Sequence, residues 1–489
     1  MKLMKTIKSY LLLILSFGLI NSTYSENLKN ENNTNNPKNI NSSITIGPKS
    51  PGGLKEAIKI AENNDTIYLK NGVYSGEDNT GICITKSIKI EGLGSKVSIN
   101  GQGKRQIFII KKGNVTLKNL KLVNGRTSKS GGGIYSESDS LTLINCIFSK
   151  NQAKRNGGAI YSNNNLTIEQ CTLEKNIASK KGGAISCEDG FLIVSNSFFT
   201  NNKAEHGGAI DCDGSTINDC TFKNNKAKGF GGGITSLNST INNCTFKNNK
   251  ANGFGGAITS SSSTINQCSF TNNQAKGVDG GAIYADVSTI NSCTFNNNQA
   301  KIDGGAISCN SNSTINKSTF INNKTKLDGG AISSLESSIN NCTFKNNQGR
   351  HGGAINDYSD STINNCTFIN NKAKLDGGAI YEEGGPWNSY NEYIDKSNFL
   401  VSNSTFSKNQ AKRNGGAFYS KGDSVIEKCT FEKNKAKLKG GAIYNQAKSV
   451  KITNTNFKNN MIAKDYNAIY SKITLTQENV TMSPKDGSK

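Results

Sequence analysis

A tetrapeptide, Gly-Gly-Ala-Ile or a close variant, recurs fourteen times and constrains the fold of this sequence more than any other feature. Counted at the isoleucine position, successive copies from Ile134 to Ile469 lie 23 to 26 residues apart, except for one interval of 38. A period in the twenties is typical of a solenoid, in which each repeat is one coil that buries its apolar face against its neighbours. We therefore expect function to reside in columns of equivalent residues.

A second motif, Phe-x-x-Asn, recurs in phase with the first, and the typical unit reads STINNCTFKNNKAKxxGGAI. Short apolar runs between clusters of Asn, Gly and Ser indicate strands and turns rather than helices. A unit of about 24 residues suits three short strands and three turns. The sequence therefore predicts an all-β fold, a single-stranded right-handed parallel β-helix of the pectin-lyase-like type. A leucine-rich repeat has a similar period but needs repeated leucines, where this chain has Ile, Cys and Phe.

Stacked strands predict which residues meet. Adjacent parallel strands lie roughly 4.8 Å apart, so Phe246 should stack on Phe222 and Phe270. Asn249 and its equivalents should form an amide ladder along the axis. The alanine two residues later should allow a tight bend, and the glycine pair should free the backbone at the next corner.

The chain begins with a basic segment and an apolar run of about ten residues, which is typical of a secretory signal peptide and too short for a membrane span. No other segment is apolar enough to span a bilayer. The expected organisation is a signal peptide (1–25), an Asn-rich leader (26–44), a cap with irregular first coils (45–130), the repeat β-helix (131–482) with a loop insertion (381–399), and a polar tail (483–489).

A short amphipathic helix is predicted at about residues 53–62. Leu54, Ala57, Ile58 and Ala61 fall on one face at spacings of three and four. A solenoid has an open first coil that must be covered, and a helix with one apolar face can cover it.

The 13 cysteines suggest disulfides in an exported protein, but their spacing argues against them. Nine hold the same repeat position, two residues before the Phe, and should point inward. Neighbouring strands hold these side chains too far apart for the geometry that a disulfide prefers. We expect buried thiols that act as small hydrophobic groups. With no Cys-x-x-Cys and only two histidines, no metal or other cofactor is predicted, apart from the calcium alternative below.

The formal net charge of +22 is concentrated at one corner of the predicted coil. The third residue after the ladder Asn is basic in most coils, and further lysines lie one or two residues earlier. The candidate ligand-binding residues of this band are Lys228, Lys276, Lys301, Lys326, Arg350, Lys374, Lys412 and Lys437. One interpretation is a solvated turn that discourages association. The other is attraction to an extended polyanion, which could be an acidic polysaccharide, lipid head groups or a teichoic-acid-like polymer. Nucleic acid is not expected, because the chain is predicted to be exported and the band lacks aromatic residues.

The residue before Gly-Gly is acidic in several central coils, and His351 fills a gap in this column. The acidic residues are Asp279, Asp303, Asp328 and Asp376. Stacked carboxylates repel each other, and we expect the basic residues one to three positions earlier (Lys276, Lys301, Lys326, Arg350 and Lys374) to neutralise them. The alternatives are a calcium ladder or a glycosidase-like acid cluster. Catalysis needs two carboxylates in different environments, whereas uniform coils should supply identical ones.

Two further features could bind ligands. Thr and Asn flank the inward Ile, as in Thr240 and Asn242, and form a flat polar face that strand propensity alone explains. The 38-residue interval inserts a loop with Trp387, Tyr390 and Tyr393, which suits sugar stacking or protein contact. The alternative for this loop is a drifted coil without a role.

The paired GGAI and Phe-x-x-Asn motifs, over about 131–470, resemble the repeat of the chlamydial polymorphic outer membrane proteins and of adhesin-like surface proteins. The segment LKEAIKIAENNDTIYLKNGVYSG resembles the start of pectate-lyase-like β-helix proteins. The resemblance implies a secreted or surface adhesin. It covers the repeat without the C-terminal autotransporter barrel of the chlamydial family.

The function that we expect is therefore non-enzymatic. The chain should be a secreted, cell-surface or outer-membrane-associated protein, a monomeric rod that binds anionic polysaccharide, a cell-surface polymer or a host surface protein. The first alternative is a polysaccharide lyase or glycoside hydrolase, which this fold often hosts. The second is a structural surface-coat protein.

Overall fold

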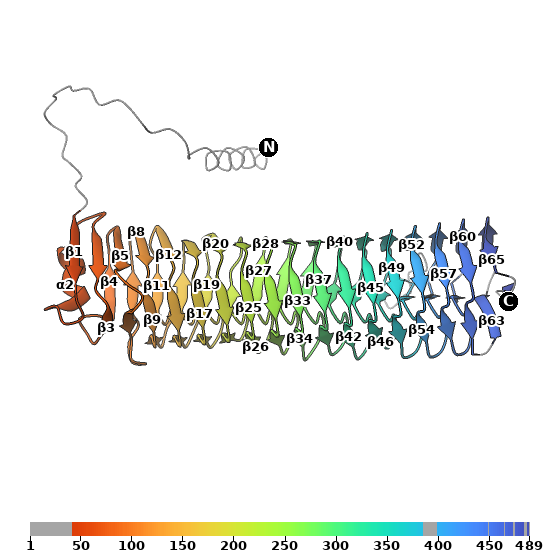
Figure 1. Cartoon of the computed structure of the whole chain (residues 1–489), viewed down its shortest axis with the longest axis horizontal. Helices are drawn as coiled ribbons and strands as arrows, with labels where there is room; N and C mark the ends of the chain where they lie inside the picture. Colours follow the sequence, from red (N-terminus) through yellow and green to blue (C-terminus); the bar gives the residue numbers. More distant parts are fainter. Residues whose placement is uncertain are drawn as a thin grey trace, which may run out of the picture. The chain divides into compact units, whose positions relative to one another are not determined.

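The structure is a computed structural model that describes residues 42–384, 399–447, 449–463, 465–472, 475–483 and 487–488. Within the unit Asn41–Lys489, short β-strands stack into one continuous solenoid (Figure 1). Equivalent strands of successive coils pair in parallel throughout the repeat. The predicted all-β parallel solenoid is confirmed.

A typical coil contains four strand segments, β24 (Thr216–Asn218), β25 (Thr221–Lys223), β26 (Lys226–Ala227) and β27 (Ile234–Leu237). The stack that contains β24 has 18 strands. We expected three strands per coil and a bend at the alanine. The expectation was wrong, because Lys226 and Ala227 pair in register with Lys250 and Ala251 of the next coil and form a fourth, two-residue strand.

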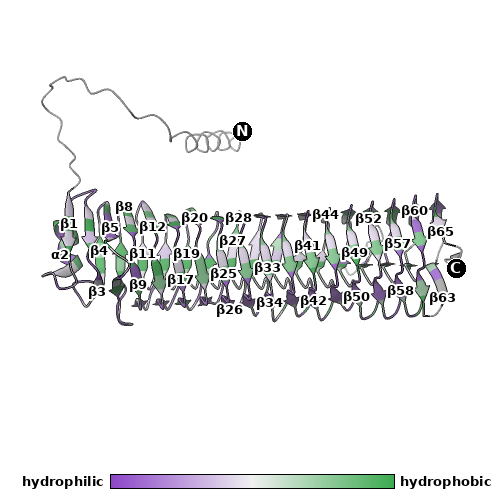
Figure 2. Cartoon of the chain, viewed as in Figure 1, coloured by the Kyte–Doolittle hydropathy of each residue, from purple (hydrophilic) through white to green (hydrophobic). Residues whose placement is uncertain are grey.

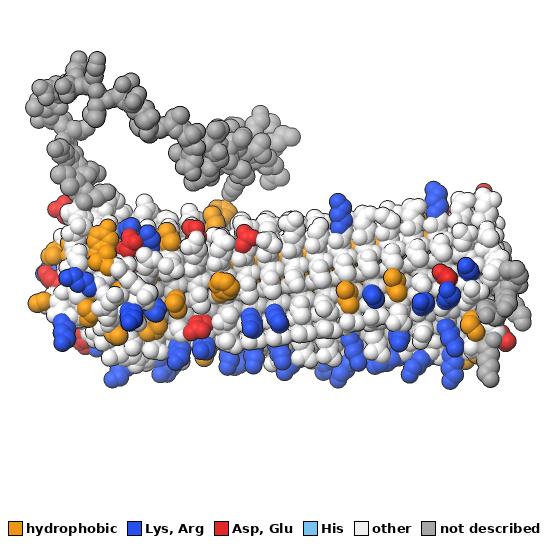
Figure 3. All heavy atoms as spheres, in the orientation of Figure 1, with side chains coloured by type: hydrophobic (Ala, Val, Ile, Leu, Met, Phe, Trp, Pro, Cys, Tyr) orange, Lys and Arg blue, Asp and Glu red, His pale blue; other side chains and the backbone are white. Residues whose placement is uncertain are grey.

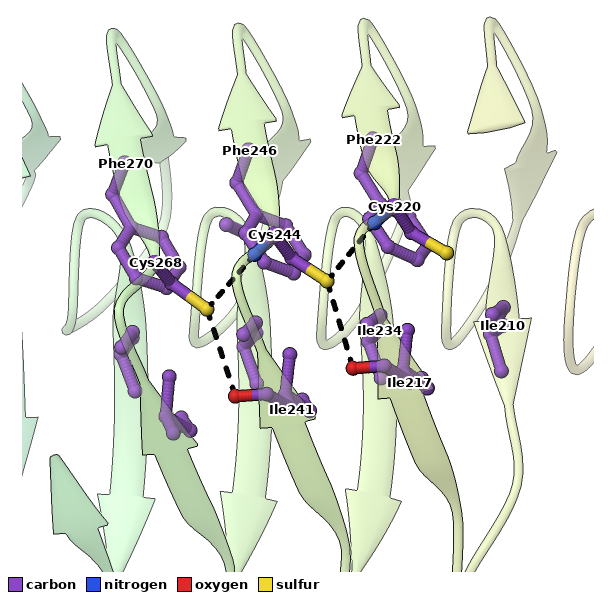
Figure 4. Close-up of a cluster of buried hydrophobic side chains, with 14 of the residues drawn as sticks. Ile210, Ile217, Cys220, Phe222, Ile234, Ile241, Cys244, Phe246, Cys268 and Phe270 are labelled. Carbon is purple, nitrogen blue, oxygen red and sulfur yellow. Dashed lines mark hydrogen bonds between the residues drawn. The ribbon is translucent and has the colours of Figure 1, made fainter. Parts of the chain in front are cut away.

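Identical apolar residues form the core, as predicted. Phe222 and Phe246 stack with ring centroids 4.8 Å apart and planes within 6°. Ile217 pairs with Ile241, and Ile241 with the next coil in turn (Figure 4). Purple edges and green inner strands in Figure 2 show the same separation of polar and apolar residues. Each coil therefore adds one slice of core, and the length of the solenoid is not limited by a single globular core.

The predicted amide ladder lies beside the phenylalanine column. Asn225 Nδ2 donates to Asn249 Oδ1 at 3.1 Å and to the carbonyl of Phe199 at 2.8 Å. The backbone N–H of Asn225 also donates to Asn249 Oδ1, at 3.0 Å. A fully buried amide is thus satisfied on both sides, which removes the cost of burying it.

The cysteines are free thiols, and Cys83 is the exposed one among the thirteen. In the core, the Cys220 N–H donates to Cys244 Sγ, and the Cys244 N–H donates to Cys268 Sγ, both at 3.4 Å (Figure 4). The predicted role of these residues as buried thiols in one column is confirmed.

The two glycines of the motif are needed for different reasons. Gly231 has φ +60°, in the left-handed region that favours glycine. Gly232 faces the carbonyl of Gly256, and a Cβ on Gly232 would lie 2.1 Å from that oxygen. The first glycine therefore makes the turn, and the second permits the close approach of adjacent coils.

The first coil is covered by helix α2 (Gly53–Ile60), which is two residues shorter than predicted. Leu54, Ala57, Ile58 and Ala61 are buried, as expected for a capping helix. Strand β1 (Ser43–Ile46) pairs with β2 (Thr66–Leu69) and begins inside the segment expected to be leader. In the next two coils, β5 (Ile88–Gly92) pairs with β2, and β8 (Asn114–Lys118) pairs with β5.

Candidate functional site

The two-residue strands place the predicted basic band along one edge of the solenoid, where Figure 3 shows Lys and Arg side chains gathered. In each of these strands the first residue points outward and the second is buried, an alanine in most coils and Thr325 in one, and the residue that follows the strand points outward again. The strands of this edge include β22 (Lys203–Ala204), β26, β30 (Lys250–Ala251), β34 (Gln274–Ala275), β38 (Gln299–Ala300), β42 (Lys324–Thr325), β50 (Lys372–Ala373), β54 (Gln410–Ala411) and β58 (Lys435–Ala436).

Two rows of side chains result, and we call the surface between them the lysine trough. The inner row is Lys203, Lys226, Lys250, Gln274, Gln299, Lys324, Gln348, Lys372, Gln410 and Lys435. The outer row is Glu205, Lys228, Asn252, Lys276, Lys301, Lys326, Arg350, Lys374, Lys412 and Lys437, and Glu205 is its acidic member. The structure thus brings together all eight basic residues that the sequence nominated for this band.

Shallow hollows follow the trough from coil to coil. One of about 430 Å³ lies between Lys203, Lys226 and Lys228 and reaches Lys276. A second of about 240 Å³ continues past Lys301 and Lys326, and a third of about 440 Å³ spans Lys372 to Lys437. The trough is open and elongated, which suits a chain-like ligand better than a small molecule.

The lysines of the trough have no carboxylate partners among the residues that the structure describes. The ion pairs of the chain involve other lysines, such as Lys89 with Glu91 at 2.6 Å and Lys111 with Glu137 at 2.8 Å. Like charges one coil apart repel each other by up to roughly 1 kcal/mol in water. Glu205 is the acidic residue in the two rows, and Arg350 is paired with Asp328, but the lysines outnumber them, so the trough carries a net positive field that a polyanion would neutralise.

The aspartate column (Asp279, Asp303, Asp328 and Asp376) lies at the next corner, and its carboxylates accept hydrogen bonds from the next coil. Asp303 N–H donates to Asp279 Oδ1 at 2.9 Å, and Asp328 N–H donates to Asp303 Oδ1 at 3.0 Å. His351 N–H donates to Asp328 Oδ1 at 3.1 Å. Each carboxylate thus accepts the backbone N–H of the equivalent residue in the next coil.

The expected neutralisation by lysine was wrong for this column. Arg350 does pair with Asp328, with Nη2 and Oδ2 2.8 Å apart, but the partner of Asp376 is Arg413 rather than Lys374. Lys276, Lys301 and Lys326 are exposed in the trough and make no ion pair with the column among the described residues. The reason is the two-residue strand, which directs these lysines outward at its own edge.

The members of the column do not share one environment, contrary to the expectation of uniform coils. Burial raises the pKa of Asp303 to about 6, and Asp303 Oδ2 accepts a hydrogen bond from the hydroxyl of Tyr358 at 2.9 Å. Burial also raises the pKa of Asp279. Burial lowers the pKa of His351, whose Nδ1 lies 3.5 Å from Asp376 Oδ2. Because the carboxylates are engaged by N–H groups, arginines and a tyrosine, the column serves to join coils.

A metal centre finds no support in this geometry. Among residues 42–384 and the described segments that follow residue 398, no three His, Cys, Asp or Glu side chains are grouped to hold a metal ion.

The sequence reasoning missed an aromatic feature beside the trough. His206, Phe230, Phe254 and Tyr284 stack along the axis, with ring centroids 4.8, 5.5 and 4.5 Å apart in that order. We call these four residues the aromatic strip. The band itself lacks aromatic residues, as stated, but Phe230 and Phe254 lie only two residues after Lys228 and Asn252 of the outer row. The signal was present in the sequence as Gly-Phe-Gly-Gly in two successive repeats.

Three overlapping stretches, residues 132–286, 209–338 and 338–487, match the family described as the right-handed beta helix region. The chain belongs to this right-handed β-helix family. The matches span the whole repeat and agree with the parallel pairing of its strands. No curated protein matches the chain significantly.

Several solved structures are similar to this β-helix at low identity. A mannuronic-acid-specific polysaccharide lyase of family 6 from human gut microbiota is 13% identical, with 89% of this chain and 91% of that chain covered and a TM-score of 0.31. The A-module of the mannuronan C-5 epimerase AlgE6 of Azotobacter vinelandii is 10% identical, with coverages of 88% and 93% and a TM-score of 0.26. The family 6 alginate lyase AlyGC is 11% identical, with coverages of 90% and 89% and a TM-score of 0.28.

The other predicted sites are less informative. Trp387, Tyr390 and Tyr393 lie outside the described residues. The Thr and Asn columns form an outward face, where Asn242 Nδ2 donates to Asn218 Oδ1 at 2.9 Å. In the part of this β-helix that is described, no helix combines the length and apolar character required to cross a bilayer.

Proposed function

We propose that this β-helix is an exported, non-enzymatic adhesin-like protein that binds an extended anionic polymer along the lysine trough. The observation that carries the proposal is the pair of rows, whose lysines follow one edge for many coils and have no carboxylate partner in the described part of the chain. An acidic polysaccharide at a cell or host surface has the linear shape and repeated negative charge that this edge complements.

The sequence supports the same location. The segment 1–25 has the features of a signal peptide, and the repeat resembles that of chlamydial polymorphic outer membrane proteins and other surface adhesins. Fractionation of native cells tests this part of the proposal. The mature chain should appear in the surface or secreted fraction, and its retention in the cytoplasm would contradict export.

Binding is tested with polygalacturonate as the anionic polymer and dextran as the neutral control. The variant Lys226→Gln, Lys228→Gln, Lys250→Gln should lower the affinity for polygalacturonate at least tenfold at low salt, since each removes about 1 kcal/mol of attraction. A matched control replaces Lys89, Lys111 and Lys118, which are ion-paired elsewhere. It changes the net charge equally and should have little effect.

Two results would argue against the proposal. Equal losses in both triple variants would show that net charge, rather than the trough, attracts the polymer. Shortening of polygalacturonate during incubation would show that the protein is an enzyme. Binding with unchanged polymer length is the expected result.

A further inference from the structure

From the aromatic strip we infer that the section of the trough from Lys203 to Lys276 is a carbohydrate subsite, where the sugar rings of a linear acidic polysaccharide lie on the strip and its carboxylates meet the lysines. The inference rests on the proposed function and deepens it. It distinguishes this section from the rest of the trough by the chemistry of its ligand.

The strip is partly exposed where comparable rings are buried: Phe230 is exposed, and His206, Phe254 and Tyr284 are half-buried. Phe230 is 39% exposed, whereas the core rings Phe222 and Phe246 are fully buried. Neighbouring rings of the strip are tilted by 32°, 39° and 45°, against 6° or less for Phe222, Phe246 and Phe270 in the core. Tilted rings leave part of each face uncovered by the next ring, so the strip offers an apolar surface to solvent.

The backbone is adapted to hold these rings. A Cβ on Gly229 would lie 2.5 Å from His206 Cε1, and a Cβ on Gly253 would lie 2.9 Å from Phe230 Cδ1. The ring of one coil thus lies against the glycine of the next. His206 Nδ1 also accepts a hydrogen bond from the N–H of Phe230 at 3.3 Å, which orients the imidazole. Exposed rings held in this way are pre-organised for a ligand.

The position of the strip favours a sugar polymer over other polyanions. Phe230 and Phe254 follow Lys228 and Asn252 by two residues in the chain, and Lys228 and Asn252 line the 430 Å³ hollow. A pyranose ring has an apolar C–H face that buries well against aromatic groups, and a uronic acid unit adds one carboxylate for the lysines.

Binding assays with three probes at low salt test the inference. The probes are polygalacturonate, poly-glutamate as a polycarboxylate without sugar rings, and a single-stranded oligonucleotide. The variant Phe230→Ser, Phe254→Ser should lower the affinity for polygalacturonate five- to tenfold and change that for poly-glutamate less than twofold. A matched control, Phe191→Ser with Phe198→Ser, removes two phenylalanines that are 56% and 53% exposed elsewhere and should leave both affinities unchanged.

A second variant guards against misfolding. Phe230→Leu with Phe254→Leu keeps apolar volume but removes the flat rings, and should lower polygalacturonate affinity at least threefold with an unchanged melting temperature. Unchanged polygalacturonate affinity in both variants would overturn the inference, as would an equal loss for poly-glutamate or an equally strip-dependent affinity for the oligonucleotide. If the unaltered protein bound none of the three polyanions, the proposed function would be refuted, and the inference with it.

Discussion

The residue before Gly-Gly occupies one position of the repeat but has opposite surroundings in two neighbouring sections of this β-helix. At Phe230 and Phe254 it is an aromatic ring, exposed at Phe230 and half-buried at Phe254. At Asp303 and Asp328 it is a carboxylate that accepts the backbone N–H of the next coil. The residue before it also differs, since it is glycine in the aromatic section (Gly229, Gly253) and Ile302 or Leu327 in the aspartate section. This local sequence decides whether the corner holds stacked rings or a carboxylate that is hydrogen-bonded to the next coil.

The difference between aspartate and phenylalanine at this position indicates that the aromatic section contributes less to stability than the aspartate section. Aspartate satisfies an N–H group and joins adjacent coils, whereas phenylalanine offers no acceptor to the next coil and exposes apolar surface. Proteins depart from locally favourable choices mainly at functional sites. Lysines without an ion pair among the described residues lie beside both sections, so it is the partly exposed rings that make the aromatic section the better candidate for binding, and the aspartate section the better candidate for stability.

Both sections depend on the register that the core sets, and the largest effect should come from breaking it. Phe246→Ala removes one ring from a fully buried column and should lower the free energy of unfolding by about 3–5 kcal/mol. Urea denaturation followed by circular dichroism measures this. Phe198→Ala, at an exposed position, should cost less than about 0.5 kcal/mol. Equal effects would mean that the column does not set the register.

Removing a carboxylate of the aspartate column should have the next largest effect on the free energy of unfolding. Asp328→Ala removes the acceptor of the His351 N–H and the partner of Arg350, and should cost about 2 kcal/mol. Urea denaturation again measures the loss. The control is Glu56→Ala, which removes an exposed ion pair with Lys59 and should cost less than about 0.5 kcal/mol. A negligible loss at Asp328 would mean that the aspartate column does not join the coils.

The aspartate section should also respond to pH. Because burial raises the pKa of Asp303 to about 6, the folded chain binds a proton there that the unfolded chain has already lost. This contribution to stability is present below pH about 4 and is lost as pH rises through about 6. Asp303→Asn does not titrate, so the stability of the unaltered protein relative to this variant should fall by about 1–2 kcal/mol between pH 4 and 7.

Thermal unfolding at several pH values measures this difference. Tyr358→Phe sharpens the test, because the hydrogen bond from Tyr358 lowers the pKa of Asp303. Its loss should move the transition to higher pH. A pH-independent difference between the unaltered protein and Asp303→Asn would contradict the buried position of this carboxyl.

The smallest effect should come from converting one section into the other. Phe254→Asp supplies the acceptor that the aromatic section lacks, and should raise the free energy of unfolding by up to about 1 kcal/mol while lowering the affinity for polygalacturonate. Calorimetry and a binding assay measure the two quantities on one sample. A gain in affinity would reverse the roles that we assign to the two sections.

The repeat allowed much of this to be predicted. The period of the GGAI motif, the alternation around Cys and Phe, and the Asn three residues after Phe were enough to predict the β-helix, the phenylalanine column and the amide ladder. Each follows from strict period-2 alternation and from stacking of identical residues. The lysine band was likewise predicted as a band, because its residues hold one repeat position.

The side-chain interactions between residues at different positions of the repeat could not be predicted in the same way. Arg413 rather than Lys374 pairs with Asp376, and Tyr358 reaches Asp303 across 55 residues of sequence. These contacts depend on where each side chain points after the two-residue strand, and on the distance between coils at that corner. A repeat position alone does not specify either.

The solenoid, its register and the edge that carries the positive charge follow from the sequence, because each depends on a pattern repeated in nearly every coil. The three-dimensional structure was needed to show that the lysines of that edge have no carboxylate partners among the described residues, that the aspartates accept hydrogen bonds from the next coil, and that Phe230 and Phe254 are partly exposed near the trough. Repetition specifies what stacks along the axis, whereas contacts around the coil depend on three-dimensional distances that the repeat does not contain.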